Sequence, residues 1–196
     1  MVETSTLLRS VSGETFTFDP GAVCLTFALT GGEGERAAYE TLTRPADLER
    51  WSDAALGVGV EKATGSDFAA AKRLREAIWH LALARVEGAP LPGEHVGEVN
   101  RAAAAPPLVP QIDPDGQRAV ATPVTVGQAL STLARDAVEL FTGPLAYRIR
   151  RCAGTNCTLI FADTSRPGRR RWCSMERCGN RAKVGNFRTR QGKEEA

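Results

Sequence analysis

Four of the five cysteines of this chain lie in one C-terminal stretch, as two pairs with the same spacing. Cys152 and Cys157 form the first pair, Cys173 and Cys178 form the second, and fifteen residues separate the pairs. Two short loops that each supply two thiolates satisfy the tetrahedral preference of Zn²⁺ without a large hydrophobic core. We therefore expect these four cysteines to hold one structural zinc ion per chain.

The rest of the sequence is consistent with zinc rather than disulfides. The N-terminus lacks a basic segment followed by a long apolar run, and no stretch approaches the roughly 18 apolar residues that a membrane helix needs. We therefore expect a cytoplasmic protein that does not span a membrane, where clustered cysteines are metal ligands more often than cystines. The fifth cysteine, Cys24, lies in an apolar run and is expected to be a buried core residue.

Charge is divided unevenly between the two ends of the chain. Residues 145–196 contain 13 Lys and Arg against 4 Asp and Glu, whereas residues 1–144 contain 12 against 19. Such asymmetry indicates a polyanion-binding C-terminal end. The candidate nucleic-acid-binding residues are Arg169, Arg170, Arg171, Arg181, Lys183, Arg188 and Arg190. The alternative is a solvated cationic surface in which some arginines, above all Arg151 and Arg181, hydrogen-bond carbonyls and Asp163 to hold the segment together.

Residues 1–144 are predicted to form a mainly α-helical domain with a small antiparallel β-sheet. Helical periodicity, capping residues and helix-ending Gly or Pro indicate helices near 43–57, 66–86, 94–104 and 125–142. Residues 108–112 and 117–121 flank the turn Asp113-Pro-Asp-Gly116 and predict a hairpin. We expect the alternating segment Thr15–Phe18 to supply a third strand to that hairpin.

This domain carries no recognisable catalytic pattern. His80 and His95 lack a Cys or Asp at a catalytic spacing, so a structural or surface role is expected for both. The glycine-rich segment Thr30–Gly34 has neither the lysine and hydroxyl of a P-loop nor a dinucleotide-binding spacing. We expect a protein that is not an enzyme.

Residues 145–196 are predicted to form a separate zinc module. Residues 158–162 and 170–173 are predicted to be two strands of a hairpin, and a helix is expected to begin near Cys178, the last ligand. A hairpin followed by such a helix is the general plan of a treble clef. Four thiolates leave no position for a zinc-bound water, so a hydrolytic zinc is not expected.

The same segment resembles the CGNR zinc finger, a family named after the residues that are Cys178 to Arg181 here. The resemblance rests on both cysteine pairs and on Ile160-Phe-Ala-Asp163-Thr-Ser-Arg166, Arg169-Arg-Arg-Trp-Cys-Ser-Met175 and Cys178-Gly-Asn-Arg-Ala-Lys183. Residues 1–144 are similar in layout to the helical domain that accompanies this finger in bacterial stress-induced transcription regulators. The chain departs from that pattern at Thr26 and Leu29, where relatives tend to carry Asp and Asn.

The resemblance implies a nucleoid-associated, DNA-binding transcription regulator. Its finger would contact DNA, and its N-terminal domain would sense a small-molecule effector or form a homodimer. Two other interpretations stay open: an RNA- or ribosome-associated protein, because zinc modules also bind structured RNA, and a protein-interaction adaptor whose zinc is purely structural. Base stacking by exposed Phe161, Trp172 or Phe187 would favour RNA.

Overall fold

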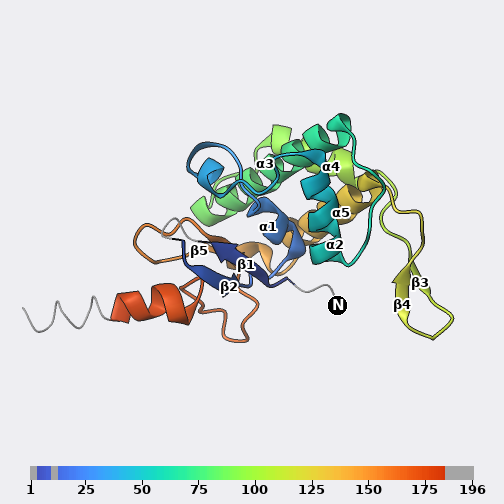
Figure 1. Ribbon diagram of the computed structural model, residues 1–196. Coiled ribbons are helices and arrows are strands. Elements are labelled where there is room, and N and C mark those ends of the chain that lie inside the picture. Colours follow the sequence, from blue (N-terminus) through green and yellow to red (C-terminus); the bar gives the residue numbers. More distant parts are fainter. Residues whose placement is uncertain (1–3, 10–12, 184–196) are drawn as a thin grey trace, which may run out of the picture.

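The structure, a computed structural model, describes residues 4–9 and 13–183. Its body is a group of helices, within which α3, α4 and α5 pack against one another and α1 contacts both α3 and α5 (Figure 1). The α-helices are α1 Val23–Ala28, α2 Pro45–Leu56, α3 Gly65–Glu87, α4 Gly93–Ala103 and α5 Val126–Thr142. None of the helices in the described ranges is both long and apolar enough to cross a bilayer. The predicted mainly helical domain is confirmed.

Local capping explains where the two longest helices begin. At the start of α3 the Asp67 N–H donates to Thr64 Oγ1 (3.2 Å), and the Thr64 N–H donates to Asp67 Oδ2 (2.9 Å). Thr125 and Gln128 make the same reciprocal pair at the start of α5. Each pair satisfies N–H groups that the first helical turn leaves without partners. The starts of these two helices agree with the sequence prediction to within a residue or two.

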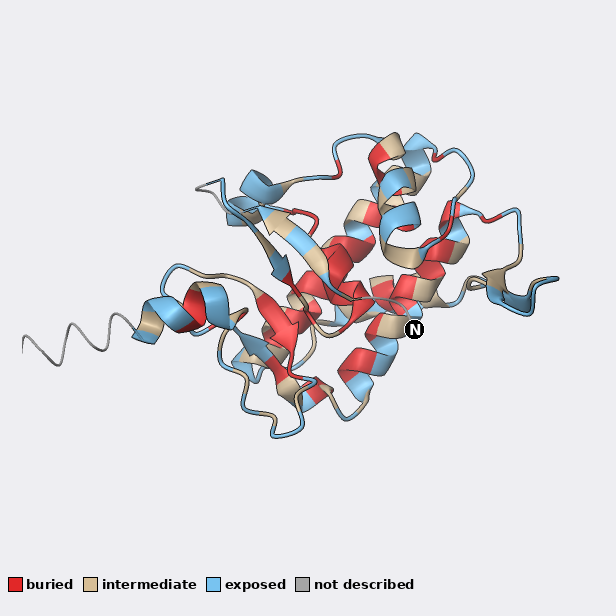
Figure 2. Ribbon diagram, turned by 60° about the horizontal axis from the view of Figure 1, so that its bottom comes forward, coloured by how far each residue is buried: buried red, intermediate tan, exposed pale blue. Residues whose placement is uncertain are grey.

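The main hydrophobic core surrounds α1. All six residues of this short helix are buried, and its neighbours supply Leu74 and Ile78 from α3 and Leu133 from α5. Figure 2 shows this buried centre, with exposed residues on the outer surfaces of the helices. Cys24 belongs to this core, as predicted, with no exposed surface.

The described strands form three separate two-stranded antiparallel sheets. They pair β1 Thr6–Arg9 with β2 Thr15–Phe18, β3 Pro110–Ile112 with β4 Arg118–Val120, and β5 Ile149–Arg151 with β6 Ile160–Ala162. The β3–β4 hairpin projects from the helices (Figure 1). The prediction that Thr15–Phe18 joins it was wrong, because β1 lies only a few residues away and a local hairpin closes a much shorter loop.

Strand β6 lies between two hydrophobic cores. Its three residues are all buried; Ile160 and Ala162 belong to the main core, while Phe161 belongs to a second cluster that contains Cys152, Cys173 and Cys178. Alternate residues of a strand point to opposite faces. A single strand therefore joins the helical body to the cysteine cluster.

The partner of β6 differs from the sequence prediction. Residues 170–173 do not pair with it, because their backbone groups bond elsewhere: the Arg171 carbonyl accepts from the Ala153 N–H (2.8 Å) and the Arg170 N–H donates to Asp163 Oδ2 (2.7 Å). This segment therefore runs beside the first cysteine loop. The expected helix is present as a π-helical turn, Met175–Gly179, that continues into helical residues 180–183.

Candidate metal centre and its surroundings

The four C-terminal cysteines converge on one point. The sulfurs of Cys152, Cys157, Cys173 and Cys178 all lie within 4.8 Å of one another, and those of Cys157 and Cys173 are 3.9 Å apart. A tetrahedral zinc with Zn–S bonds of about 2.3 Å places its sulfurs about 3.8 Å apart. The cluster therefore fits one zinc ion with four thiolate ligands.

Two short turns deliver these ligands. Cys152 follows β5, and the chain returns at Cys157 through Asn156, which adopts a left-handed conformation with φ of 60°. On the other side, Ser174 caps the turn that carries Cys178, its hydroxyl accepting from the Arg177 N–H (3.2 Å). The last ligand thus lies in the first turn of a helix, as predicted.

Hydrogen bonds within the cluster favour the thiolate form of Cys152. The Cys157 and Cys173 thiols and the backbone N–H groups of Cys173 (3.2 Å) and Gly154 (3.4 Å) donate to its sulfur, and they hold its pKa below the ordinary value. A metal ligand must be deprotonated, so the two backbone donors, which remain when zinc binds, favour Cys152 as a ligand. The thiols that donate to it must lose their own protons before they bind zinc, and donation to Cys152 raises the pKa of Cys157.

Gly154 is required by the close packing of the two loops. A Cβ atom at this position would lie 2.7 Å from the Cys178 sulfur and 2.9 Å from its Cβ. No side chain fits that space, so glycine allows the first cysteine loop to approach the second.

An aromatic shell covers the cysteine cluster on its inner side. Phe18 and Phe161 pack with three of the cysteines, and Phe16 and Leu8 of the N-terminal hairpin lie against the same group. The shell excludes water from that side of the sulfurs. It also means that the first two strands of the chain pack on the zinc module although 130 residues separate them from it.

Arg170 holds this shell together. Its guanidinium donates to the carbonyls of Asp19 (2.9 Å), Trp172 (3.1 Å) and Cys173 (2.6 Å), and its Cζ lies 4.2 Å from the centre of the Phe161 ring. The hydrogen-bond donors of this side chain therefore stabilise the fold. Sequence reasoning had grouped Arg170 with its neighbours as a nucleic-acid contact, since three consecutive arginines give no signal of which one turns inward.

Asp163 is a second residue whose hydrogen bonds stabilise the interior of the module. It is fully buried, and its carboxylate accepts from the Ser165 N–H (3.0 Å) and the Arg170 N–H (2.7 Å). Although burial opposes its ionisation, these hydrogen bonds and the nearby Arg148 keep its pKa below the ordinary value. Arg151 and Arg181, the arginines expected to brace this carboxylate, do not reach it: Arg151 is exposed, and Arg181 pairs with Glu14 of the N-terminal segment (3.3 Å).

The other predicted nucleic-acid-binding side chains lie on the outside of the module. Those that the structure describes, apart from Arg170, are all exposed: Arg169, Arg171, Arg181 and Lys183. Arg171 lies over the Trp172 ring, with its Cζ 4.7 Å from the ring centre. Arg188 and Arg190 lie outside the described residues.

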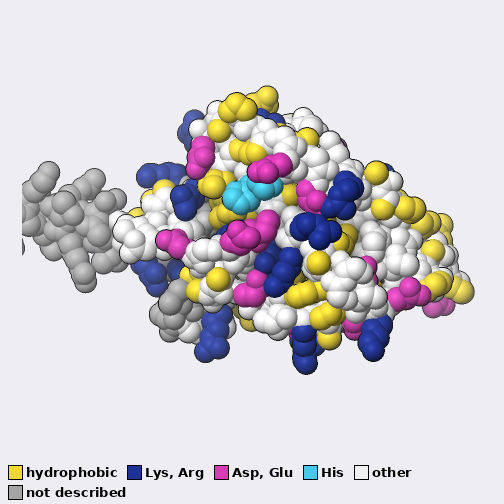
Figure 3. Space-filling view, turned by 90° about the horizontal axis from the view of Figure 1, so that it is seen from above, with side chains coloured by type: hydrophobic (Ala, Val, Ile, Leu, Met, Phe, Trp, Pro, Cys, Tyr) yellow, Lys and Arg dark blue, Asp and Glu magenta, His cyan; other side chains and the backbone are white. Residues whose placement is uncertain are grey.

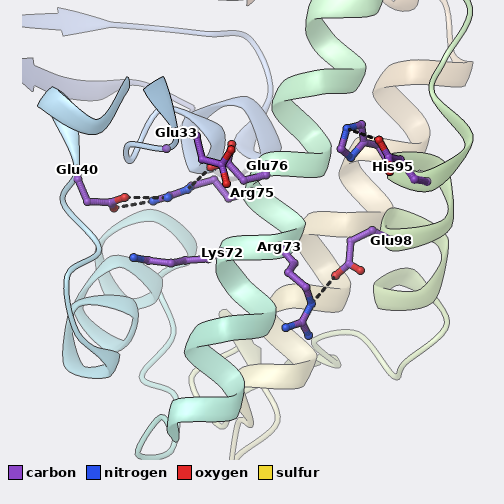
Figure 4. Close-up of a pocket in the computed structure, with 10 residues that line it drawn as sticks. Glu33, Glu40, Lys72, Arg73, Arg75, Glu76, His95 and Glu98 are labelled. Atoms are coloured by element: carbon purple, nitrogen blue, oxygen red, sulfur yellow. Dashed lines mark hydrogen bonds and ion pairs between the residues drawn. The ribbon is translucent and has the colours of Figure 1, made fainter. Parts of the chain in front are cut away.

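A polar cavity of about 530 Å³ lies on the helical body, lined by residues of α3, α4 and the loop after α1. Figure 3 shows the two histidines on this face among charged side chains. Figure 4 shows that the charges pair with each other: Arg75 binds both oxygens of Glu40 (2.6 and 2.8 Å), and Arg73 pairs with Glu98 (3.6 Å). His80 and His95 stack at 4.5 Å between ring centres. Most of the charged side chains that line this cavity are therefore paired within the chain.

Two family models match this chain. The ABATE model, described as "Putative stress-induced transcription regulator", matches residues 21–144, and the CGNR zinc finger model matches residues 148–191. No curated protein matches the chain. The match to the CGNR finger agrees with the geometry of the four-cysteine cluster, which holds one zinc ion.

Proposed function

Because the chain belongs to the ABATE family of transcription regulators and carries a CGNR zinc finger, we propose that it regulates transcription by binding duplex DNA through that finger. The observation that carries this proposal is the charge of the finger surface. In residues 145–183 the acidic residues are Asp163, which is buried, and Glu176. The exposed surface of the finger is thus almost uniformly cationic, as a phosphate-binding surface needs to be.

Two groups of side chains would contact the nucleic acid. Arg169 and Arg171 extend outward on either side of the anchored Arg170, and Arg181 and Lys183 lie on the helix that follows the last zinc ligand. Guanidinium groups bind phosphate oxygens in a bidentate manner and also read guanine edges in the major groove. Arg170 is left out of this surface because its donors are used by backbone carbonyls.

The zinc in this proposal is structural and the protein is not an enzyme. All four ligand positions are thiolates, so the ion holds the two loops and the helix in place and offers no site for a water nucleophile. We propose that the protein acts in the cytoplasm, on the nucleoid.

The positions of two aromatic rings considered for stacking on RNA bases, Phe161 and Trp172, weigh against RNA. Sequence-specific RNA binding commonly relies on exposed aromatic rings that stack on unpaired bases. Phe161 is fully buried, and the half-buried Trp172 ring is covered by Arg171. Neither of these two rings is free to stack on a base. Phe187 lies outside the described residues, and Tyr147 near the start of the module is 79% exposed, so a direct comparison of duplex DNA with structured RNA decides between the two proposals.

The helical domain would serve as the regulatory part. We propose that it senses a small-molecule effector, with homodimerisation as its second candidate role. The projecting β3–β4 hairpin favours the second role, because the side chain of Ile112 at its tip is 81% exposed. An uncovered large apolar side chain on a projecting hairpin is suited to contact a second copy of the chain.

The DNA-binding proposal is tested by titrating the zinc-loaded protein into fluorescent duplex DNA over a range of salt concentrations. Affinity is expected to fall steeply with salt, and the double variant R169A/R171A is expected to bind more weakly with a salt slope smaller by about two. Arg118→Ala, at an exposed position of β4, is the matched control and should bind normally. Salt-independent binding would favour the adaptor alternative, and tighter binding to a structured RNA than to duplex DNA would favour the RNA alternative.

A further inference from the structure

A second cavity lies where the helical body meets the zinc finger. It has a volume of about 460 Å³ and is lined by the β1–β2 hairpin, the segment around the 3-10 turn η1 Gly34–Tyr39, α3, and the loop that leads from Cys157 to β6. We call it the junction cleft. Its volume lies within the range of cavities that bind small molecules.

The walls of the junction cleft are aromatic and aliphatic. The side chains that make its apolar surface are Leu7, Phe16, Leu29, Tyr39, Trp79 and Leu159. Two of them remain uncovered, with exposed fractions of 69% for Leu7 and 37% for Tyr39. Large apolar side chains gathered at the mouth of a cavity indicate that an apolar group is bound there.

Arg177 supplies a positive charge in this cleft. Its Cζ lies 4.2 Å from the centre of the Phe16 ring, and its Nε atom is buried without a hydrogen-bond partner. Within the described part of the chain, no carboxylate lies at ion-pair distance from Arg177. Because this Nε atom is enclosed, an anion in the cleft would pair with the terminal nitrogens of the guanidinium.

Three other charged side chains line the cleft. Arg9 is exposed and donates to the Gly13 carbonyl (3.3 Å), whereas Arg36 and Glu40 are paired within the chain. Arg36 pairs with Glu76 and donates to the Gly31 carbonyl, and Glu40 accepts two hydrogen bonds from Arg75 and one from the Leu42 N–H. Arg177 is therefore the cation best placed to receive an anion from outside the chain.

We propose that the junction cleft binds a small aromatic or branched-chain carboxylate, with its carboxylate on the Arg177 guanidinium and its apolar body among Leu7, Phe16 and Tyr39. The carboxylate of such a ligand matches the fork of a guanidinium in a bidentate pair. The inference rests on the proposed function, because it assigns the effector site of a DNA-binding regulator.

The position of the cleft explains how this ligand would reach the DNA surface. One wall belongs to the helical domain, and the other contains the zinc ligand Cys157 and Arg177, the neighbour of the zinc ligand Cys178. The helix that carries Arg177 continues to the exposed Arg181 and Lys183. A ligand that contacts both walls favours one position of this helix over others, and by linkage DNA and ligand must then affect each other's affinity equally.

The test uses the full-length zinc-loaded protein and a pair of probes, 2-naphthoate and its uncharged analogue 2-naphthamide, titrated by calorimetry. Naphthoate is expected to bind at one site per chain and about tenfold or more tighter than naphthamide, because the analogue lacks the charge that pairs with the guanidinium. Equal affinity for the two probes, or no saturable naphthoate binding at millimolar concentration, would overturn the proposal.

Two variants locate the binding site. Arg177→Gln is expected to abolish the preference for naphthoate while keeping its zinc, and Ala38→Trp, at an exposed position that lines the cleft, is expected to block both probes. Arg166→Gln, at an exposed finger position outside the cleft, is the matched control and should bind like the parent. Unchanged naphthoate binding in both R177Q and A38W would place the probe elsewhere and refute the assignment.

Different experiments test the ligand-binding proposal for the junction cleft and the proposed regulator function. Probe binding is measured without DNA, so the naphthoate titrations alone test the proposed ligand site. The proposed function fails if the zinc-loaded protein does not bind duplex DNA. Where both hold, saturating naphthoate is expected to change the DNA affinity of the parent, and to leave that of R177Q unchanged.

Discussion

The ring of Phe18 meets the ring of Phe161 edge to face, with 6.5 Å between their centres and 82° between their planes. One ring comes from the second strand of the chain, and the other from the strand that follows the first zinc loop. Edge-to-face aromatic pairs contribute beyond the area they bury. This contact makes the N-terminal hairpin part of the packing of the finger, so the stability of one depends on the other.

Loss of zinc is expected to release the N-terminal hairpin as well as the finger. Cys173→Ser removes one of four ligands, and zinc binding supplies about 10 kcal/mol or more of folding free energy in small zinc modules. Metal analysis should give about one zinc per chain for the parent and little for this variant. Limited proteolysis should then cleave near residues 4–18 as well as within the finger.

Cys24→Ser is the control for this experiment. Cys24 is buried in the helical core, and burial raises the pKa of its thiol well above the ordinary value. The variant should keep its zinc. Proteolytic protection of the hairpin in zinc-free C173S would contradict the shared packing of Phe18 and Phe161.

Gly154→Ala is expected to weaken zinc binding without changing any ligand. The added methyl group would lie 2.7 Å from the Cys178 sulfur, so the two loops must move apart. Overpacking of this kind costs about 1–3 kcal/mol, which corresponds to a loss of about 5-fold to about 150-fold in zinc affinity. Competition with a chromophoric chelator measures the change. Gly59→Ala, where an added Cβ meets nothing within 4 Å, should keep the parental affinity.

Arg170 and Arg171 are adjacent, yet their substitution should have opposite effects. Arg170→Ala leaves three carbonyls without their donor and is expected to lower the free energy of unfolding by about 2–4 kcal/mol. Arg171→Ala should change stability little and weaken DNA binding instead. Urea denaturation and DNA titration on both variants separate the two roles, and a stable R170A with impaired DNA binding would reverse the assignment.

Acid is expected to remove the stabilisation that Asp47 gives to the start of α2. Hydrogen bonds from the Thr43 hydroxyl (2.7 Å) and from the backbone N–H groups of Thr43 (2.8 Å) and Arg44 (3.0 Å) lower the pKa of Asp47. The pKa of Asp47 is lower in the folded chain than in the unfolded chain, where it is about 3.9. The contribution of Asp47 to the free energy of unfolding is therefore complete above a pH of about 3.9. It is lost as the pH falls through the pKa of the folded state.

A comparison of Asp47→Asn with the parent measures the contribution of the Asp47 carboxylate to the free energy of unfolding. The difference in free energy of unfolding between the two should be largest at neutral pH and should shrink as the pH falls below about 4. Acid also displaces zinc, but equally from both proteins, so zinc loss cancels in the difference. Thr43→Val removes a hydroxyl donor and should move the change to higher pH. A difference that stays constant down to pH 2.5 would show that Asp47 does not titrate in this way.

Local patterns predicted the helices and the zinc ligands because each is set by residues close in sequence. Capping by Thr64 and Thr125 and the two cysteine spacings are readable without knowledge of the rest of the chain. The strand Thr15–Phe18 was also recognised, but its partner was not, since alternation marks a strand and not its neighbour.

Long-range contacts could not be read in the same way. The packing of Phe18 on Phe161 and the hydrogen bond from Arg170 to the Asp19 carbonyl join residues more than 140 positions apart. The junction cleft likewise forms only where five separate segments meet. The division of the chain at residue 144 stays a prediction. The N-terminal hairpin, which precedes this boundary, packs against the zinc module, which follows it.

The placement of β6 between two cores has a consequence for synthesis of the protein. The β1–β2 hairpin is synthesised before the finger, yet the surface that covers Phe18 is completed only when Phe161, Cys173 and Cys178 have emerged. During that interval the hairpin lacks most of the residues that pack against it in the second cluster. Zinc loading therefore completes the packing of this hairpin, and a chain deprived of zinc is expected to leave the apolar face of the strand pair open to chaperones and proteases.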